Sequence, residues 1–207
     1  MTELVEIHPQ NPQPRLIRQV LDVLNAGGVI IYPTDSCYAF GCALGNKEGM
    51  ERIRRIRGLD DRHNMTLMCR DLSEIATYAK VDNQAYRLIK GLTPGPYTFL
   101  LKATHEVPRR LQNPKRKTIG IRVPDHPIVQ ALLAVENEPL MSTTVQLPGD
   151  EHPLADPFEM AERLRGRVDL VVDGGACGIE TTTVIDLVGE VPEVLRRGKG
   201  PVDWLVS

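Results

Sequence analysis

Apolar positions recur along the chain with two periods, one typical of helices and the other of strands. In PRLIRQVLDVLNAGG they recur every three or four residues, with proline near the start and glycine just past the end, which predicts a helix beginning at Pro14. The next segment, VIIYPT, is a β-branched run that Pro33 ends, which predicts a strand. The two patterns continue to alternate until about residue 200.

Other predicted helices follow side chains that commonly cap helix N-termini. Asn46 precedes a helix that runs through Arg57, with isoleucines on one side and arginines on the other. Asp71 and Asp82 precede two more helices. Two further helices are predicted in HPIVQALLAVENE and PFEMAERLRG, and the remaining strands in MTLMC, TPGPYTFLLKAT, TIGIRVP, PLMSTT, RVDLVVDGG, TTTVIDL and VPEVLRRGKG.

The alternation of helices and strands predicts a single α/β domain with a twisted, partly parallel open sheet. No repeat and no segment of linker composition divides the 207 residues. We expect the domain to span 14–200, with a polar, proline-rich N-terminal extension at 1–13 and a C-terminal tail at 201–207. Sheets of this kind bind ligands where strand ends open into loops.

Composition restricts the class of protein but not its activity. Hydrophobic residues make up 42% and charged residues 25%, as in ordinary globular proteins. No apolar run approaches the ~20 residues that span a bilayer, and the N-terminus has no signal-peptide pattern, so we expect a cytoplasmic protein with no membrane partner. The four cysteines are then expected to be reduced, and with five scattered histidines they predict no metal site.

Positive charge is concentrated in three patches although the net charge is −2. The patches are ERIRRIR at 51–57, RRLQNPKRK at 109–117 and RRGK at 196–199. Any one of them alone is more typical of a solvated helix face or loop, but together they favour a polyanionic partner. The second patch supplies candidate RNA-binding residues, namely Arg109, Arg110, Lys115, Arg116 and Lys117.

Four predicted strands end in arginine or in residues with short oxygen-bearing side chains, and we expect these side chains to form one polar rim. They are Thr34-Asp35-Ser36, Arg122, Ser142-Thr143-Thr144 and Thr181-Thr182-Thr183. Taken singly, each is more typical of a turn or cap than of a ligand group, and Arg122 is equally typical of a structural ion pair. Together they predict a pocket for an anion, although neither GxxxxGK[ST] nor GxGxxG is present to specify a nucleotide.

Four segments, in order, resemble the motifs of the YrdC-like family: VIIYPTDSCYAFG, LTPGPYTFLLKAT, TIGIRVPDHPIVQALL and VVDGGACGIETTTVIDLVGEVPEVLRRG. The resemblance implies the YrdC-like fold, an open sheet with helices packed around it and a concave basic surface. It also implies L-threonylcarbamoyladenylate synthesis, in which ATP, L-threonine and bicarbonate yield threonylcarbamoyl-AMP and pyrophosphate, with Mg²⁺ accompanying ATP. That product serves the t6A modification of tRNA.

The chain departs from two motifs of the family's synthases. Where they carry KxR, this chain has Arg57 and Leu59, and where they carry SxN it has Thr144 and Gln146. These departures, with RHNMTLMCRDL, resemble the YciO branch of the family. A lost hydrogen bond to a charged group is worth about 1.5–3 kcal/mol, or ~10- to 100-fold in rate, so a slow or substrate-altered synthase is expected. Arg62 is a candidate to replace the charge missing at Leu59.

The resemblance implies roles for individual residues. The expected catalytic residues are Arg57, Thr144 and Gln146. The expected substrate-binding residues are Thr34, Asp35, Ser36, Asn64, Arg122, Ser142 and Thr182. The expected nucleotide-binding residues are Arg57, Ser142, Thr144, Gln146 and Arg196. Thr182 is equally typical of an ordinary strand residue, and Arg196 of a solvated edge charge.

Three functions stay open on the sequence. The first is the nucleotidyltransferase just described. The second is a protein that binds double-stranded or structured RNA, such as tRNA or rRNA, through basic patches and without synthase activity. The third is a hydrolase of a threonylcarbamoyl or related adenylate.

Overall fold

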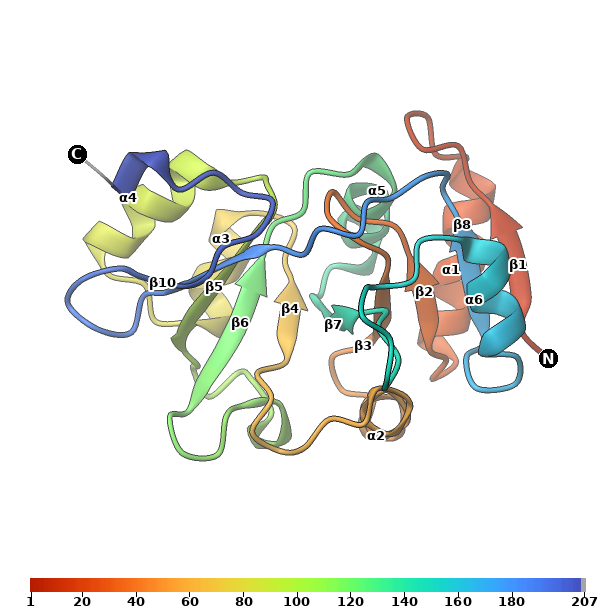
Figure 1. Cartoon of the computed structure of the whole chain (residues 1–207), viewed down its shortest axis with the longest axis horizontal. Coiled ribbons are helices and arrows are strands. Elements are labelled where there is room, and N and C mark those ends of the chain that lie inside the picture. Colours follow the sequence, from red (N-terminus) through yellow and green to blue (C-terminus); the bar gives the residue numbers. More distant parts are fainter. Residues whose placement is uncertain (206–207) are drawn as a thin grey trace.

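The computed structural model describes residues 1–205, which form a ten-stranded sheet and six α-helices (Figure 1). The strands are β1 (Glu3–Glu6), β2 (Ile30–Tyr32), β3 (Ala39–Ala43), β4 (Thr66–Met68), β5 (Tyr97–Lys102), β6 (Thr118–Arg122), β7 (Leu140–Thr144), β8 (Leu170–Asp173), β9 (Thr183–Asp186) and β10 (Glu193–Arg196). The helices are α1 (Pro14–Asn25), α2 (Lys47–Arg57), α3 (Leu72–Tyr78), α4 (Asn83–Leu92), α5 (Pro127–Glu136) and α6 (Pro157–Arg163).

The sheet is open and partly parallel, as predicted. Its strand order is β1-β8-β2-β3-β7-β4-β6-β5-β9-β10. β8 pairs in parallel with both β1 and β2, β4 with β6, and β5 with β9, while the other neighbours are antiparallel. No helix within residues 1–205 combines the length and apolar character needed to cross a bilayer.

The capping side chains identified in the sequence act as predicted. Asn46 accepts a hydrogen bond from the Gly49 amide at 2.9 Å, and α2 ends at Gly58 with a left-handed φ of 66°. Asp71 and Asp82 cap α3 and α4 in the same way, accepting amide hydrogens at 3.0 and 2.8 Å. These caps fix where each helix begins and, in α2, where Arg57 is placed.

Both ends of the chain join the fold more closely than the expected domain limits imply. In the expected extension at 1–13, β1 pairs with β8 at the edge of the sheet, and Val5 and Ile7 are buried. In the expected tail at 201–207, Trp204 packs against the larger core cluster, and residues 206–207 lie outside the described residues. The edge strand β1 therefore belongs to the folded domain.

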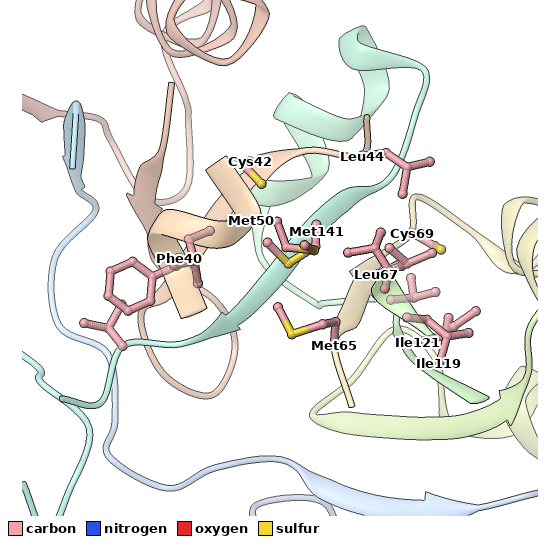
Figure 2. Close-up of a cluster of buried hydrophobic side chains, with 14 of the residues drawn as sticks. Phe40, Cys42, Leu44, Met50, Met65, Leu67, Cys69, Ile119, Ile121 and Met141 are labelled. Atoms are coloured by element: carbon pink, nitrogen blue, oxygen red, sulfur yellow. The ribbon is translucent and has the colours of Figure 1, made fainter. Parts of the chain in front are cut away.

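The two faces of the sheet are covered unequally. On one face α2, α3, α4 and α6 pack on the larger core cluster, part of which Figure 2 shows around Met65, Leu67 and Met141. On the other face α1 and α5 cover a smaller cluster centred on β8, β2 and the start of β7. Because these two helices pack at one end only, the face formed by β4, β6, β5 and β9 is left without a helix.

Candidate functional site

A hollow of about 380 Å³ opens on the sheet face that α1 and α5 leave uncovered. Its floor follows the strand register, because paired residues point to the same face. Ser142 pairs with Thr66, Thr66 pairs with Gly120, and Met68 pairs with Arg122 in the adjacent row. Gly120 lets its neighbours pack closely, since a Cβ there would lie 3.0 Å from the Thr66 hydroxyl and 3.2 Å from the Thr98 methyl group. The row through Ser142, Thr66 and Gly120 therefore carries only small side chains.

Most of the predicted site residues line this one hollow. They come from segments far apart in the sequence: Ser36, Arg57, Asn64, Arg122, Ser142, Thr144, Gln146, Thr182 and Arg196. The proximity of these side chains is a structural fact, while their catalytic and binding roles stay predictions. Arg62, the candidate for the charge missing at Leu59, also lines the hollow, whereas Leu59 is not among the lining residues.

Thr34 and Asp35 lie one layer behind the lining, not in it. The Thr34 hydroxyl donates to the Cys37 carbonyl at 2.7 Å and accepts from the Ser36 amide at 3.1 Å, so it closes the turn after β2. Asp35 forms an ion pair with Arg122, and both side chains are largely buried. The structure thus gives these two residues a supporting position behind the lining, and their substrate-binding role stays a prediction.

Arg57 connects helix α2 to the segment that follows β7. Its Nε donates to the Gln146 carbonyl at 3.0 Å, and its Nη1 donates to the Thr143 hydroxyl at 2.7 Å. Burial, and secondarily the charge of Arg196, lowers the pKa of Arg57. The guanidinium is thus held in position by neutral partners, which leave its charge uncompensated.

The lining is strongly biased towards positive charge. It contains Arg57, Arg62, Arg122 and Arg196 and no aspartate or glutamate. Within residues 1–205 only Arg122 of these four has a carboxylate partner, Asp35. Burial also lowers the pKa of Arg196, which a neighbouring carboxylate would oppose. An anion that enters the hollow would relieve this accumulation of like charge.

The hydroxyls around the hollow differ in how free they are to contact a ligand. Ser142 is fully buried, and its Oγ donates to the Phe40 carbonyl at 2.7 Å and lies 2.8 Å from the Tyr32 hydroxyl. Its single proton is therefore engaged within the protein. The Thr144 hydroxyl makes no hydrogen bond within the described chain and is partly exposed. Of these two predicted phosphate ligands, Thr144 is the available donor.

Thr66, Thr98 and His63 line the hollow but were not predicted from the sequence. Thr66 and Thr98 lie within strands, whereas the rim was expected at strand ends, because an uncovered face exposes residues all along a strand. Thr98 is 2.7 Å from the Thr182 hydroxyl, which also accepts from Arg196 at 3.1 Å. A single threonine within each of the otherwise largely apolar strands TLM and YTFLLK was the available signal.

The lining does not suit a resident metal ion. Mg²⁺ prefers carboxylate and other oxygen ligands, and no carboxylate faces the hollow. Across residues 1–205, no group of three or more histidine, cysteine, aspartate or glutamate side chains is close enough to hold a metal.

The candidate RNA-binding residues lie in the segment between β5 and β6. None of Arg109, Arg110, Lys115, Arg116 and Lys117 lines the hollow. Arg116 is already paired with Asp186, with 2.7 Å between Nη2 and Oδ2. This basic segment thus borders the hollow without lining it, since Asn113 donates to the Arg62 carbonyl at 3.2 Å.

Comparison with known proteins identifies the family. The family model for Sua5, YciO and YrdC, described as "Telomere recombination", matches residues 22–198. The uncharacterized protein YciO of Escherichia coli K12 is 57% identical over 202 residues, covering 98% of each chain. A threonylcarbamoyl-AMP synthase of Halorhodospira halophila is 29% identical over 178 residues, covering 86% of this chain and 92% of the relative.

Solved structures show the same fold. The crystal structure of E. coli YciO has a TM-score of 0.95 at 57% identity, covering 98% of both chains. P. abyssi Sua5 complexed with L-threonine has a TM-score of 0.88 at 24% identity, covering 99% of this chain and 59% of that one. On the family match and the identity to YciO, the chain belongs to the Sua5/YciO/YrdC family.

Proposed function

We propose that this chain is a nucleotidyltransferase of the threonylcarbamoyl-AMP synthase type. It would convert ATP, L-threonine and bicarbonate into threonylcarbamoyl-AMP and pyrophosphate, and so serve the t6A modification of tRNA. The main observation in support is the composition of the hollow, whose lining contains four arginines, several hydroxyls and no carboxylate. Family relatives at 28–29% identity are named threonylcarbamoyl-AMP synthases or putative ones, and a Sua5 of the same fold was crystallised with L-threonine.

The chemistry needs an electropositive site more than a nucleophile of the protein. A carbamate oxygen of the substrate attacks the α-phosphorus of ATP, and the bond to the pyrophosphate oxygen breaks. Negative charge then grows on the leaving oxygens, and donors placed beforehand stabilise it. Arg57 and Thr144, which both line the hollow, would supply such donors. Cys37 is no competing nucleophile, because burial raises the pKa of its thiol to about 11.

Mg²⁺ belongs to this proposal as a companion of ATP. Since no carboxylate lines the hollow, Mg²⁺ would be bound by the phosphate oxygens of ATP and not by the protein.

The altered motifs lead to a prediction about Arg62. Replacing Arg62 with alanine is expected to weaken ATP binding about tenfold, because one hydrogen bond to a charged group is worth roughly 1.5–3 kcal/mol and Arg62 is exposed. Calorimetric titration with ATP measures the change. Arg55→Ala is the matched control, since Arg55 is exposed on α2 and does not line the hollow. Equal effects of the two variants would mean that Arg62 acts only through net charge.

The proposed activity has a direct assay. Purified protein is incubated with ATP, Mg²⁺, bicarbonate and each amino acid in turn, while pyrophosphate is measured. We expect release that requires both L-threonine and bicarbonate, at a rate below that of a family synthase with intact KxR and SxN motifs. Pyrophosphate release with a different amino acid, and not with L-threonine, would mean that the other amino acid is the substrate. The absence of release with every amino acid would refute the proposed function.

A further inference from the structure

Among the residues that line the hollow, His63 has a distinct chemistry. It follows Arg62 in the segment between α2 and β4, and it faces the hollow together with Arg57. Its imidazole makes no hydrogen bond to any residue from 1 to 205. The other polar side chains in the lining are arginines, hydroxyls, amides and the Cys37 thiol. At neutral pH, His63 is therefore the one lining side chain able to accept a proton.

The proposed reaction releases a proton before the nucleotide reacts. The threonine ammonium and bicarbonate give the carbamate, water and one proton: R–NH₃⁺ + HCO₃⁻ → R–NH–COO⁻ + H₂O + H⁺. The nitrogen forms a bond to carbon, and the C–OH bond of bicarbonate breaks. The departing hydroxide takes one amine proton and leaves as water. Of the two ammonium protons lost, one is thus left over, and a site without carboxylates needs another acceptor for it.

We propose that the His63 imidazole is this acceptor, the general base for carbamate formation from an α-amino acid. The inference rests on the proposed function and adds a catalytic residue to it. His63 takes the proton from the substrate nitrogen and later returns it to solvent, so the imidazole is unchanged over the cycle. Its place beside Arg57 puts proton acceptance next to the expected phosphate site.

The charges around His63 connect its basicity to nucleotide binding. Burial is the main influence and lowers its pKa, and so do the cations Arg57, Arg54 and Arg196, while Asp60 opposes them. The free protein therefore holds the imidazole neutral and ready to accept. When a triphosphate neutralises the neighbouring arginines, its negative charge raises the affinity of His63 for a proton. Base strength thus increases once ATP is bound.

The test compares His63→Gln with the wild type in threonine-dependent pyrophosphate release, measured against pH. Loss of a general base is expected to lower kcat by about 10²–10⁴-fold near neutral pH, with the KM for ATP changed less than about threefold. The rate of the variant should rise steadily with pH, because the free amine then forms without help. Added imidazole should partly restore His63→Gly. His105→Gln, an exposed histidine outside the hollow, is the control and should retain full activity.

The outcomes separate the inference from the proposed function. Wild-type kcat and pH profile in His63→Gln overturn the inference alone. A raised KM for ATP at unchanged kcat also overturns it, because His63 would then only position the nucleotide. Absence of threonine-dependent release in the wild type refutes the proposed function and the inference with it. The thermal unfolding temperature of each variant shows whether a loss of activity comes from a loss of folding. Added imidazole would not restore the activity of a misfolded variant.

Discussion

Replacing Arg57 with alanine is expected to lower the rate of threonine-dependent pyrophosphate release by about 10²–10³-fold, the usual cost of losing one fixed donor to developing charge. The wild-type guanidinium is oriented by the Gln146 carbonyl and the Thr143 hydroxyl, and its charge has no carboxylate partner within residues 1–205. It is therefore placed in advance for an anion. Steady-state kinetics on both variant and wild type measure the loss.

Two controls sharpen this prediction. Arg57→Lys keeps the charge but not the planar fork, so it should recover part of the rate. Arg55→Ala, one helical turn from Glu51 on the exposed side of α2, should change nothing. If Arg57→Ala raises the KM for ATP and leaves kcat unchanged, Arg57 contributes only to binding of the ground state. That result would contradict the role proposed for it.

Replacing Asp35 with alanine is expected to destabilise the fold by about 3–5 kcal/mol, the typical cost of leaving a buried charge unpaired. The Arg122 side chain is only 6% exposed, and its Nε is buried without a hydrogen-bond partner in the described residues. Asp35 also accepts the Asp125 amide at 2.9 Å. For a chain of this length the loss corresponds to a fall of about 6–20 °C in Tm, measurable by calorimetry.

The double variant Asp35→Ala, Arg122→Met separates charge from packing. Removing both charges avoids the unpaired guanidinium, so the double variant should recover most of the stability. It should not recover synthase activity, because Arg122 lines the hollow. If Asp35→Ala alone unfolds at the wild-type temperature, the ion pair is not what holds this wall of the hollow.

Much of the fold could be predicted because local signals agreed with the tertiary structure. The helix caps at Asn46, Asp71 and Asp82 and the apolar helix faces are sequence features that the packing preserves. Two strands escaped prediction. β1 has only one buried residue among four, and β3 is almost wholly buried and contains Gly41, so neither shows a clear alternation.

The composition of the site could be predicted, but its position could not. The YrdC-like motifs identified side chains that do meet in one hollow, including Arg57 and Thr144. The sequence placed them at strand ends, whereas the hollow extends along a sheet face to Thr66 and Thr98. That difference depends on which face the helices cover and on strand register, and both are set by long-range packing. The engagement of Ser142 by Phe40 and Tyr32 is likewise visible only in three dimensions.

The central claim is that the arginines and hydroxyls on the uncovered sheet face bind one triphosphate. A crystal structure with a non-hydrolysable ATP analogue tests it most directly. We predict phosphate oxygens about 2.7–3.2 Å from the Arg57 guanidinium and the Thr144 hydroxyl, in the hollow that Thr66 also lines. Phosphates bound instead at the basic segment 109–117, or a hollow still empty of nucleotide at saturating concentration, would contradict the account.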